Sequence, residues 1–170
     1  MKKKEKKFNV FVALVHLVEA LWLGFLFAIV PMYIFRGTYH DAATKATYEN
    51  LILTVVSVVA AALCLILLYR ADDEAARMDG RDALKAALIP TAIHVLLCAL
   101  ISWTKYPLIL LGGVFPLAEL LSPGAHNITE QPAWSWIVAA LMVAPILAAA
   151  VYVGCLAARR KRQKELSHKS

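Results

Sequence analysis

Three acidic or basic side chains interrupt otherwise uncharged apolar runs of this chain, and these are His16, Glu19 and His94. His16 and Glu19 are three residues apart, so on a helix they share one face. A carboxylate beside imidazoles can change its protonation near neutral pH, which is the chemistry of a proton or cation relay. The same groups can instead hold helices together, because polar side chains inside membranes form hydrogen bonds across helices.

A metal site is the third alternative, since one carboxylate and two imidazoles could bind a metal ion. The carboxylate-rich ligand sets of metal-binding bundles are not present, because no second acid lies within any of the predicted membrane spans. We therefore expect neither a metal site nor a cofactor.

Four long apolar runs must position these groups, at residues 8–35, 51–69, 84–104 and 134–158. Of the 170 residues, 61% are hydrophobic and the mean hydropathy is +0.64, whereas a soluble domain has about 45–50% apolar residues. Uncharged runs of about 18 residues or more are typical of membrane spans. The sequence predicts an all-α fold, an integral membrane four-helix bundle that forms one domain over residues 1–170.

The positive charges predict the orientation of this bundle. Of 18 Lys and Arg residues, 15 lie in three segments, which are the tail 1–7, the connection 70–85 and the tail 159–170. Positively charged segments stay in the cytoplasm. We therefore expect a multi-pass protein with both termini in the cytoplasm, in a bacterial plasma membrane, and we read the net charge of +6 as topology rather than nucleic-acid binding.

Residues 106–121 form a further apolar segment, interrupted by Pro107, Gly112, Gly113 and Pro116. This run is short for a span. A fifth crossing would also put the basic C-terminal tail outside. The sequence thus predicts a re-entrant or interfacial segment on the outer face, between the third and fourth spans.

Depth along each predicted span suggests one polar layer. At ~1.5 Å per residue, counted from the cytoplasmic ends, the depths are about 12, 16, 15 and 18 Å for His16, Glu19, His94 and Ser57. We expect Glu19 to face His94 inside the bundle, because an ionised carboxylate in hydrocarbon is costly. In having four spans and one carboxylate in the first of them, this chain resembles the small multidrug transporters. It is longer than they are, and its Lys and Arg residues are strongly biased to one side of the membrane, so we infer no membership in that family.

Other residues have structural roles in the prediction. The fourth span carries a small-residue ridge for close helix packing, formed by Ala140, Ala144 and Ala148. The basic residues after it are expected to contact anionic lipid headgroups, and these are Arg159, Arg160, Lys161 and Arg162. Asp82 is the expected cap of the third helix. Aromatic side chains at the span ends are typical of interfacial belts, here Tyr69, Trp103, Trp134 and Trp136.

Three functions are compatible with these features. The first is a non-catalytic accessory, assembly or scaffold subunit with a membrane-protein partner, since the sequence contains no Walker loop, GxSxG or HExxH motif. The second is a small transporter or channel subunit that uses the Glu/His layer as a homo-oligomer. The third is a lipid-acting membrane enzyme that uses Glu119, His126 and Glu130 in the outer segment.

Overall fold

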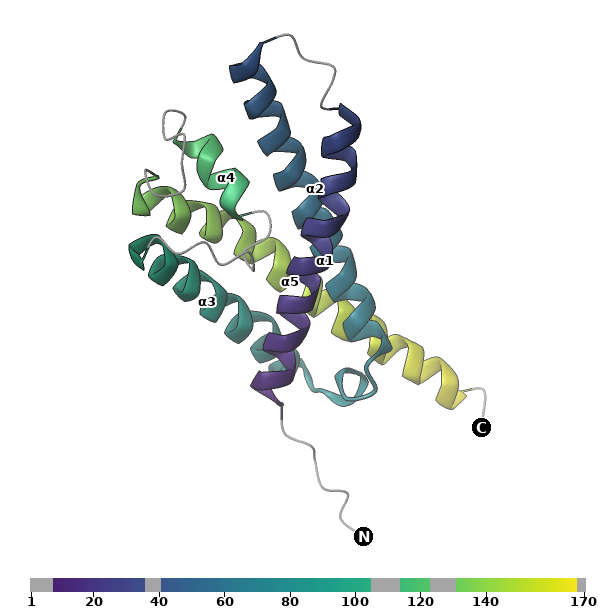
Figure 1. The fold of residues 1–170 in the computed structure, drawn as a ribbon. Coiled ribbons are helices and arrows are strands. Elements are labelled where there is room, and N and C mark those ends of the chain that lie inside the picture. Colours follow the sequence, from purple (N-terminus) through teal and green to yellow (C-terminus); the bar gives the residue numbers. More distant parts are fainter. Residues whose placement is uncertain (1–7, 36–40, 105–113, 123–130, 168–170) are drawn as a thin grey trace.

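A computed structural model of the chain describes residues 8–35, 41–104, 114–122 and 131–167. These residues form helices and contain no strand (Figure 1). The helices in chain order are α1 (Val10–Phe35), α2 (Ala42–Ala71), the short 3₁₀ helix η1 (Ala75–Arg77), α3 (Gly80–Thr104), α4 (Val114–Leu121) and α5 (Ala133–Ser167). The all-α prediction is confirmed for this part of the chain.

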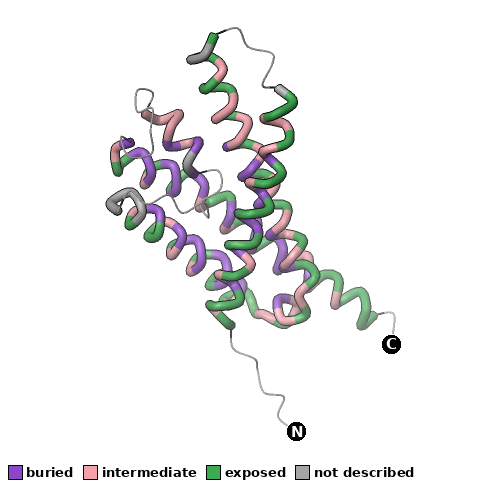
Figure 2. Tube along the Cα trace, viewed as in Figure 1, coloured by how far each residue is buried: buried purple, intermediate pink, exposed green. Residues whose placement is uncertain are grey.

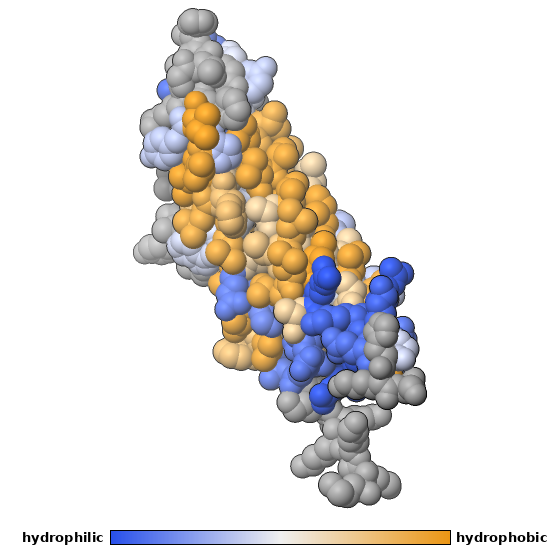
Figure 3. Space-filling view, turned by 90° about the vertical axis from the view of Figure 1, so that its right-hand side faces the viewer, coloured by the Kyte–Doolittle hydropathy of each residue, from blue (hydrophilic) through white to orange (hydrophobic). Residues whose placement is uncertain are grey.

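Four of the helices, α1, α2, α3 and α5, are long and apolar enough to cross a membrane. Their number and order match the four predicted spans and indicate a multi-pass membrane protein. The start of α1, η1 and the end of α5 lie at one end of the bundle, which we call the η1 end (Figure 1). Figure 3 shows a broad apolar zone that gives way to strongly hydrophilic side chains at this end.

Helix α5 is the central element of the bundle. It packs against α2, α3 and α4, whereas α1 packs mainly against α2. Buried positions recur along α5 with seven-residue spacing, which is the pattern of close helix packing. One series is Trp136, Val143 and Ala150, and the other is Ala140, Leu147 and Gly154. A line of buried residues therefore follows α5 through the middle of the molecule, while the outer sides of α1 and α2 are exposed (Figure 2).

Two glycines allow the helices to approach each other closely. A Cβ atom on Gly24 of α1 would lie 2.3 Å from the Ser57 carbonyl oxygen of α2. A Cβ atom on Gly154 of α5 would lie 2.8 Å from the Cβ atom of Tyr69, also on α2. Only a residue without a side chain fits at either crossing, so these glycines fix where α1 and α5 cross α2.

Two helices begin earlier than the sequence predicted. Helix α2 begins at Ala42, nine residues before the predicted span 51–69. Asp41 caps it, accepting a hydrogen bond of 2.9 Å from the Thr44 amide. Helix α3 begins at Gly80, and the prediction that Asp82 caps it is wrong. Asp79 is the cap, because its Oδ1 atom accepts a hydrogen bond of 2.7 Å from the Asp82 amide in the first turn.

The C-terminal basic residues continue the last helix. Helix α5 runs to Ser167, nine residues beyond the predicted end of the fourth span at 158. At 35 residues and ~1.5 Å per residue it is about 52 Å long, well over the ~30 Å hydrocarbon core. Its basic side chains are therefore held on a rigid helical scaffold at the η1 end.

The apolar segment before the fourth span is described only in its second half. Residues 106–113 lie outside the described residues, whereas Val114–Leu121 form α4, which packs against α5 and α2. The buried positions of α4 include Val114, Pro116 and Ala118. Eight helical residues span about 12 Å, too short to cross a bilayer.

Candidate functional site

The clearest polar cluster joins α1 to the last turn of α2. The Nδ1 atom of His16 lies 3.5 Å from Glu19 Oε2, one helical turn further along α1. The imidazole of His16 meets the ring of Tyr69 edge-on, with 5.5 Å between ring centroids. Tyr69 is only 2% exposed, and its hydroxyl has no hydrogen-bond partner among the described residues. The belt position predicted for Tyr69 is therefore wrong, because the side chain is buried between α1 and α5.

Glu19 does not lie inside the bundle as expected. Its side chain is 52% exposed, on the outer side of α1, and its hydrogen-bond partner in the described residues is His16. No hydrogen bond joins it to His94 in the described part of the chain. The predicted contact between Glu19 and His94 is corrected accordingly: the helical phase of α1 directs Ala13, Leu17 and Ala20 inward and leaves position 19 outside.

His94 occupies a separate buried environment on α3. It is 3% exposed, and its Nε2 atom lies 3.7 Å from the Sγ atom of Cys98, one turn along the same helix. The other ring nitrogen, Nδ1, has no partner among the described residues. His94 is therefore a buried polar group with part of its hydrogen-bonding capacity unused.

Ser57 lies at the crossing of α1 and α2. Its side chain is 1% exposed and its hydroxyl has no partner among the described residues. Gly24 approaches the Ser57 backbone at this crossing. Helices α2 and α3 each pack against α5, and no hydrogen bond joins the Ser57 hydroxyl to His94 among the described residues. The structure brings His16 and Glu19 together, and a relay through all four groups stays a prediction.

The small-residue ridge of α5 points toward the bundle. Ala140 is fully buried, and Ala144 and Ala148 are half-buried. Of the predicted belt residues on α5, Trp134 is exposed, whereas Trp136 is buried in the core, so its predicted belt position is wrong. With about 3.6 residues per turn, helix positions two apart point to nearly opposite sides, so α5 cannot place both tryptophans at the lipid surface.

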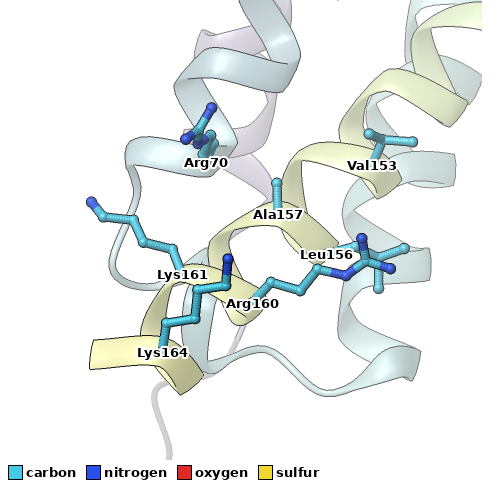
Figure 4. Close-up of a pocket in the computed structure, with 7 residues that line it drawn as sticks. All are labelled: Arg70, Val153, Leu156, Ala157, Arg160, Lys161 and Lys164. Carbon is cyan, nitrogen blue, oxygen red and sulfur yellow. The ribbon is translucent and has the colours of Figure 1, made fainter. Parts of the chain in front are cut away.

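The predicted lipid-headgroup residues divide between two sides of α5. Arg160 and Lys161 line a groove of about 480 Å³, together with Arg70 of α2 and with Lys164 (Figure 4). Arg159 and Arg162 line a second groove of about 470 Å³, together with residues at the start of α3. Sequence reasoning missed Arg70 as a neighbour of this cluster, because only the fold brings the end of α2 beside α5.

Asp79 is the acidic side chain of the second groove. Its pKa lies below the ordinary value, first because the Asp82 amide donates a hydrogen bond to it and further because of Lys85 and Arg159. Asp79 therefore stays ionised and offsets part of the positive charge of Arg159 and Arg162.

Of the three acid–base residues considered for a lipid-acting enzyme, only Glu119 lies among the described residues. Glu119 of α4 is half-buried and accepts a hydrogen bond from the Asn50 side chain, and burial raises its pKa. His126 and Glu130 lie outside the described residues. Within the described ranges, no three His, Cys, Asp or Glu side chains are grouped so that they could hold a metal ion.

Two features missed at the level of sequence had a recognisable signal. Gly24 and Gly154 stand inside apolar spans, where small residues often mark helix crossings. The burial of Tyr69 had no such signal, because a tyrosine at the end of a span is equally compatible with an interfacial position. In comparisons with known proteins, no family model, no curated protein and no solved structure matches this chain.

Proposed function

We propose that this protein is a non-catalytic subunit of a membrane complex, and that the outer face of α1 packs against a transmembrane helix of a partner protein. The observation that carries the proposal is the half-exposed carboxylate of Glu19 in the middle of a span. Large apolar side chains surround it on the exposed face of α1, at Val15, Trp22, Leu23 and Leu26.

An ionised carboxylate facing lipid costs at least ~2.5 kcal/mol at a helix centre. His16 relieves only part of this cost, because the two groups are 3.5 Å apart, at the outer limit of a hydrogen bond. A partner helix with a hydrogen-bond donor or a cation at the same depth would remove the carboxylate from lipid. Each such interhelical hydrogen bond contributes about 0.6–2 kcal/mol.

Photocrosslinking in intact membranes tests this assignment. A photoreactive side chain at Leu23, on the face that holds Glu19, should give one discrete crosslinked product. The matched control is Leu67, a similarly exposed position on α2, which should crosslink only to lipid. Equal and diffuse crosslinking at both positions would contradict a protein partner on α1.

Variants at Glu19 distinguish the kind of contact. Glu19→Gln keeps hydrogen-bonding capacity and should retain the crosslinked product, whereas Glu19→Leu should lose it. If Glu19→Leu crosslinks as well as the native chain, the carboxylate does not hold the partner.

The second candidate is a transporter or channel subunit. It is favoured by the His16–Glu19 pair and by the edge contact of His16 with Tyr69, which together form a chain of titratable groups. Under this alternative the crosslinked product would have twice the mass of the chain. Glu19→Gln would then assemble normally but abolish ion or proton flux in reconstituted vesicles.

A further inference from the structure

A groove at the η1 end combines four cationic side chains with an apolar floor. Arg70, in the last turn of α2, lines it together with three cations of α5 (Figure 4). The lining residues are Arg70, Arg160, Lys161 and Lys164, with Val153, Leu156 and Ala157 forming the floor. The groove therefore has both a positively charged part and an apolar part.

The four cations are not neutralised within the described part of the chain. The ion pairs Lys85–Asp82 on α3 and His16–Glu19 on α1 lie outside this groove, and none of the four cations pairs with an acid of the described residues. Like charges that share a groove repel one another, more strongly where the apolar floor lowers the local dielectric. An anion bound between α2 and α5 would offset this repulsion.

We propose that this groove binds an anionic phospholipid of the surrounding membrane. The phosphate lies between Arg70 and the cations of α5, where guanidinium groups form charge-assisted hydrogen bonds to phosphate oxygens. One acyl chain covers Val153 and Leu156. The volume of about 480 Å³ falls within the range of small-molecule sites.

The apolar floor favours a lipid over a free phosphate ion. Val153 is half exposed on the side of α5 that continues into the apolar zone of the molecule. A free phosphate gains nothing from this surface, whereas an acyl chain buries it. The lining residues belong to the η1 end, where the apolar zone gives way to strongly hydrophilic side chains (Figure 3). In a membrane, headgroup phosphates lie at such a boundary. This inference is independent of the partner proposed for α1.

The test uses the full-length protein in detergent, titrated with phosphatidylglycerol and, separately, with phosphatidylcholine. Each charge near a membrane surface contributes ~1 kcal/mol, so Arg70→Gln should weaken phosphatidylglycerol binding about fivefold. Arg81→Gln is the matched control, because Arg81 is also exposed at the η1 end but does not line the groove. It should change the affinity less than about twofold.

The outcomes separate the possible sources of the anion. Preferential binding of phosphatidylglycerol that is lost in Arg70→Gln and kept in Arg81→Gln supports the proposal. An equal loss of phosphatidylglycerol affinity in both variants would indicate diffuse attraction to surface charge instead of a site. If inorganic phosphate raises the melting temperature of the protein as much as phosphatidylglycerol does, the groove binds a free anion and not a lipid. Unchanged affinity in Arg70→Gln would overturn it. If Arg70→Gln does not purify folded, Lys164→Gln takes its place with the same expected loss.

Discussion

Replacing Gly24 by alanine should destabilise the bundle at the crossing of α1 and α2. The new Cβ atom would lie 2.3 Å from the Ser57 carbonyl oxygen, whereas carbon–oxygen contacts in proteins begin near ~3.3 Å. Helix α1 would have to move off α2 by about 1 Å, and a gap of this size forfeits about a quarter to a half of the dispersion energy of the affected contacts.

The net effect combines two opposing contributions. Overpacking of this kind costs about 1–3 kcal/mol. The higher helix propensity of alanine returns up to about 1 kcal/mol. We therefore expect the free energy of unfolding of Gly24→Ala to fall by up to about 2 kcal/mol.

The assay is equilibrium unfolding in mixed micelles, followed by circular dichroism. Gly80→Ala is the control, because a Cβ atom there would meet nothing within 4 Å. That substitution should leave stability unchanged or raise it by up to about 1 kcal/mol, by reducing the freedom of the unfolded chain. If Gly24→Ala proves as stable as Gly80→Ala, the close crossing of α1 and α2 is not present in the folded protein.

Three further predictions follow from the ends and the orientation of the helices. Asp79→Ala should lower the melting temperature, and Asp79→Asn should lower it less, because asparagine also caps but carries no charge. Since the folded pKa of Asp79 is lowered, the contribution of its charge is full above the unfolded pKa and is lost as pH falls through the folded value. The pKa of Glu119 is shifted in the opposite direction, upward, so its pH dependence is also opposite: stability should fall as pH rises through the folded pKa of Glu119. Glu119→Gln should abolish this fall in a series of melting curves recorded at different pH. An impermeant thiol reagent added outside intact cells should label Ala46→Cys and not Arg81→Cys, and the reverse pattern would invert the proposed topology.

The number and type of helices could be predicted from the sequence because long uncharged runs dominate it. Each run needs only to be long and apolar to be assigned to a span, and neither property depends on tertiary contacts. Helix ends were less predictable. The polar residues after Asp41 look like a loop by composition, but a capping carboxylate is sufficient to extend α2 through them.

The partners of the polar groups could not be predicted, because depth along a span does not determine the direction of a side chain. Glu19 and His94 have matching depths, yet Glu19 is on the outer face of α1 while His94 is buried on α3. Rotation of each helix is set by packing, and here the packing depends on Gly24 and Gly154. The contact of His16 with Tyr69 is a product of those crossings.

The central position of α5 has a consequence for biogenesis. Helices α1 and α2 are neighbours in sequence and in space, so this hairpin can close as soon as both have entered the bilayer. Helix α3 has its main packing partner in α5, which follows it in the chain by about thirty residues. During synthesis the face of α3 that α5 buries, including His94, therefore stays exposed until α5 has been inserted. Insertase or chaperone dependence should be concentrated in this interval between the third and fourth spans.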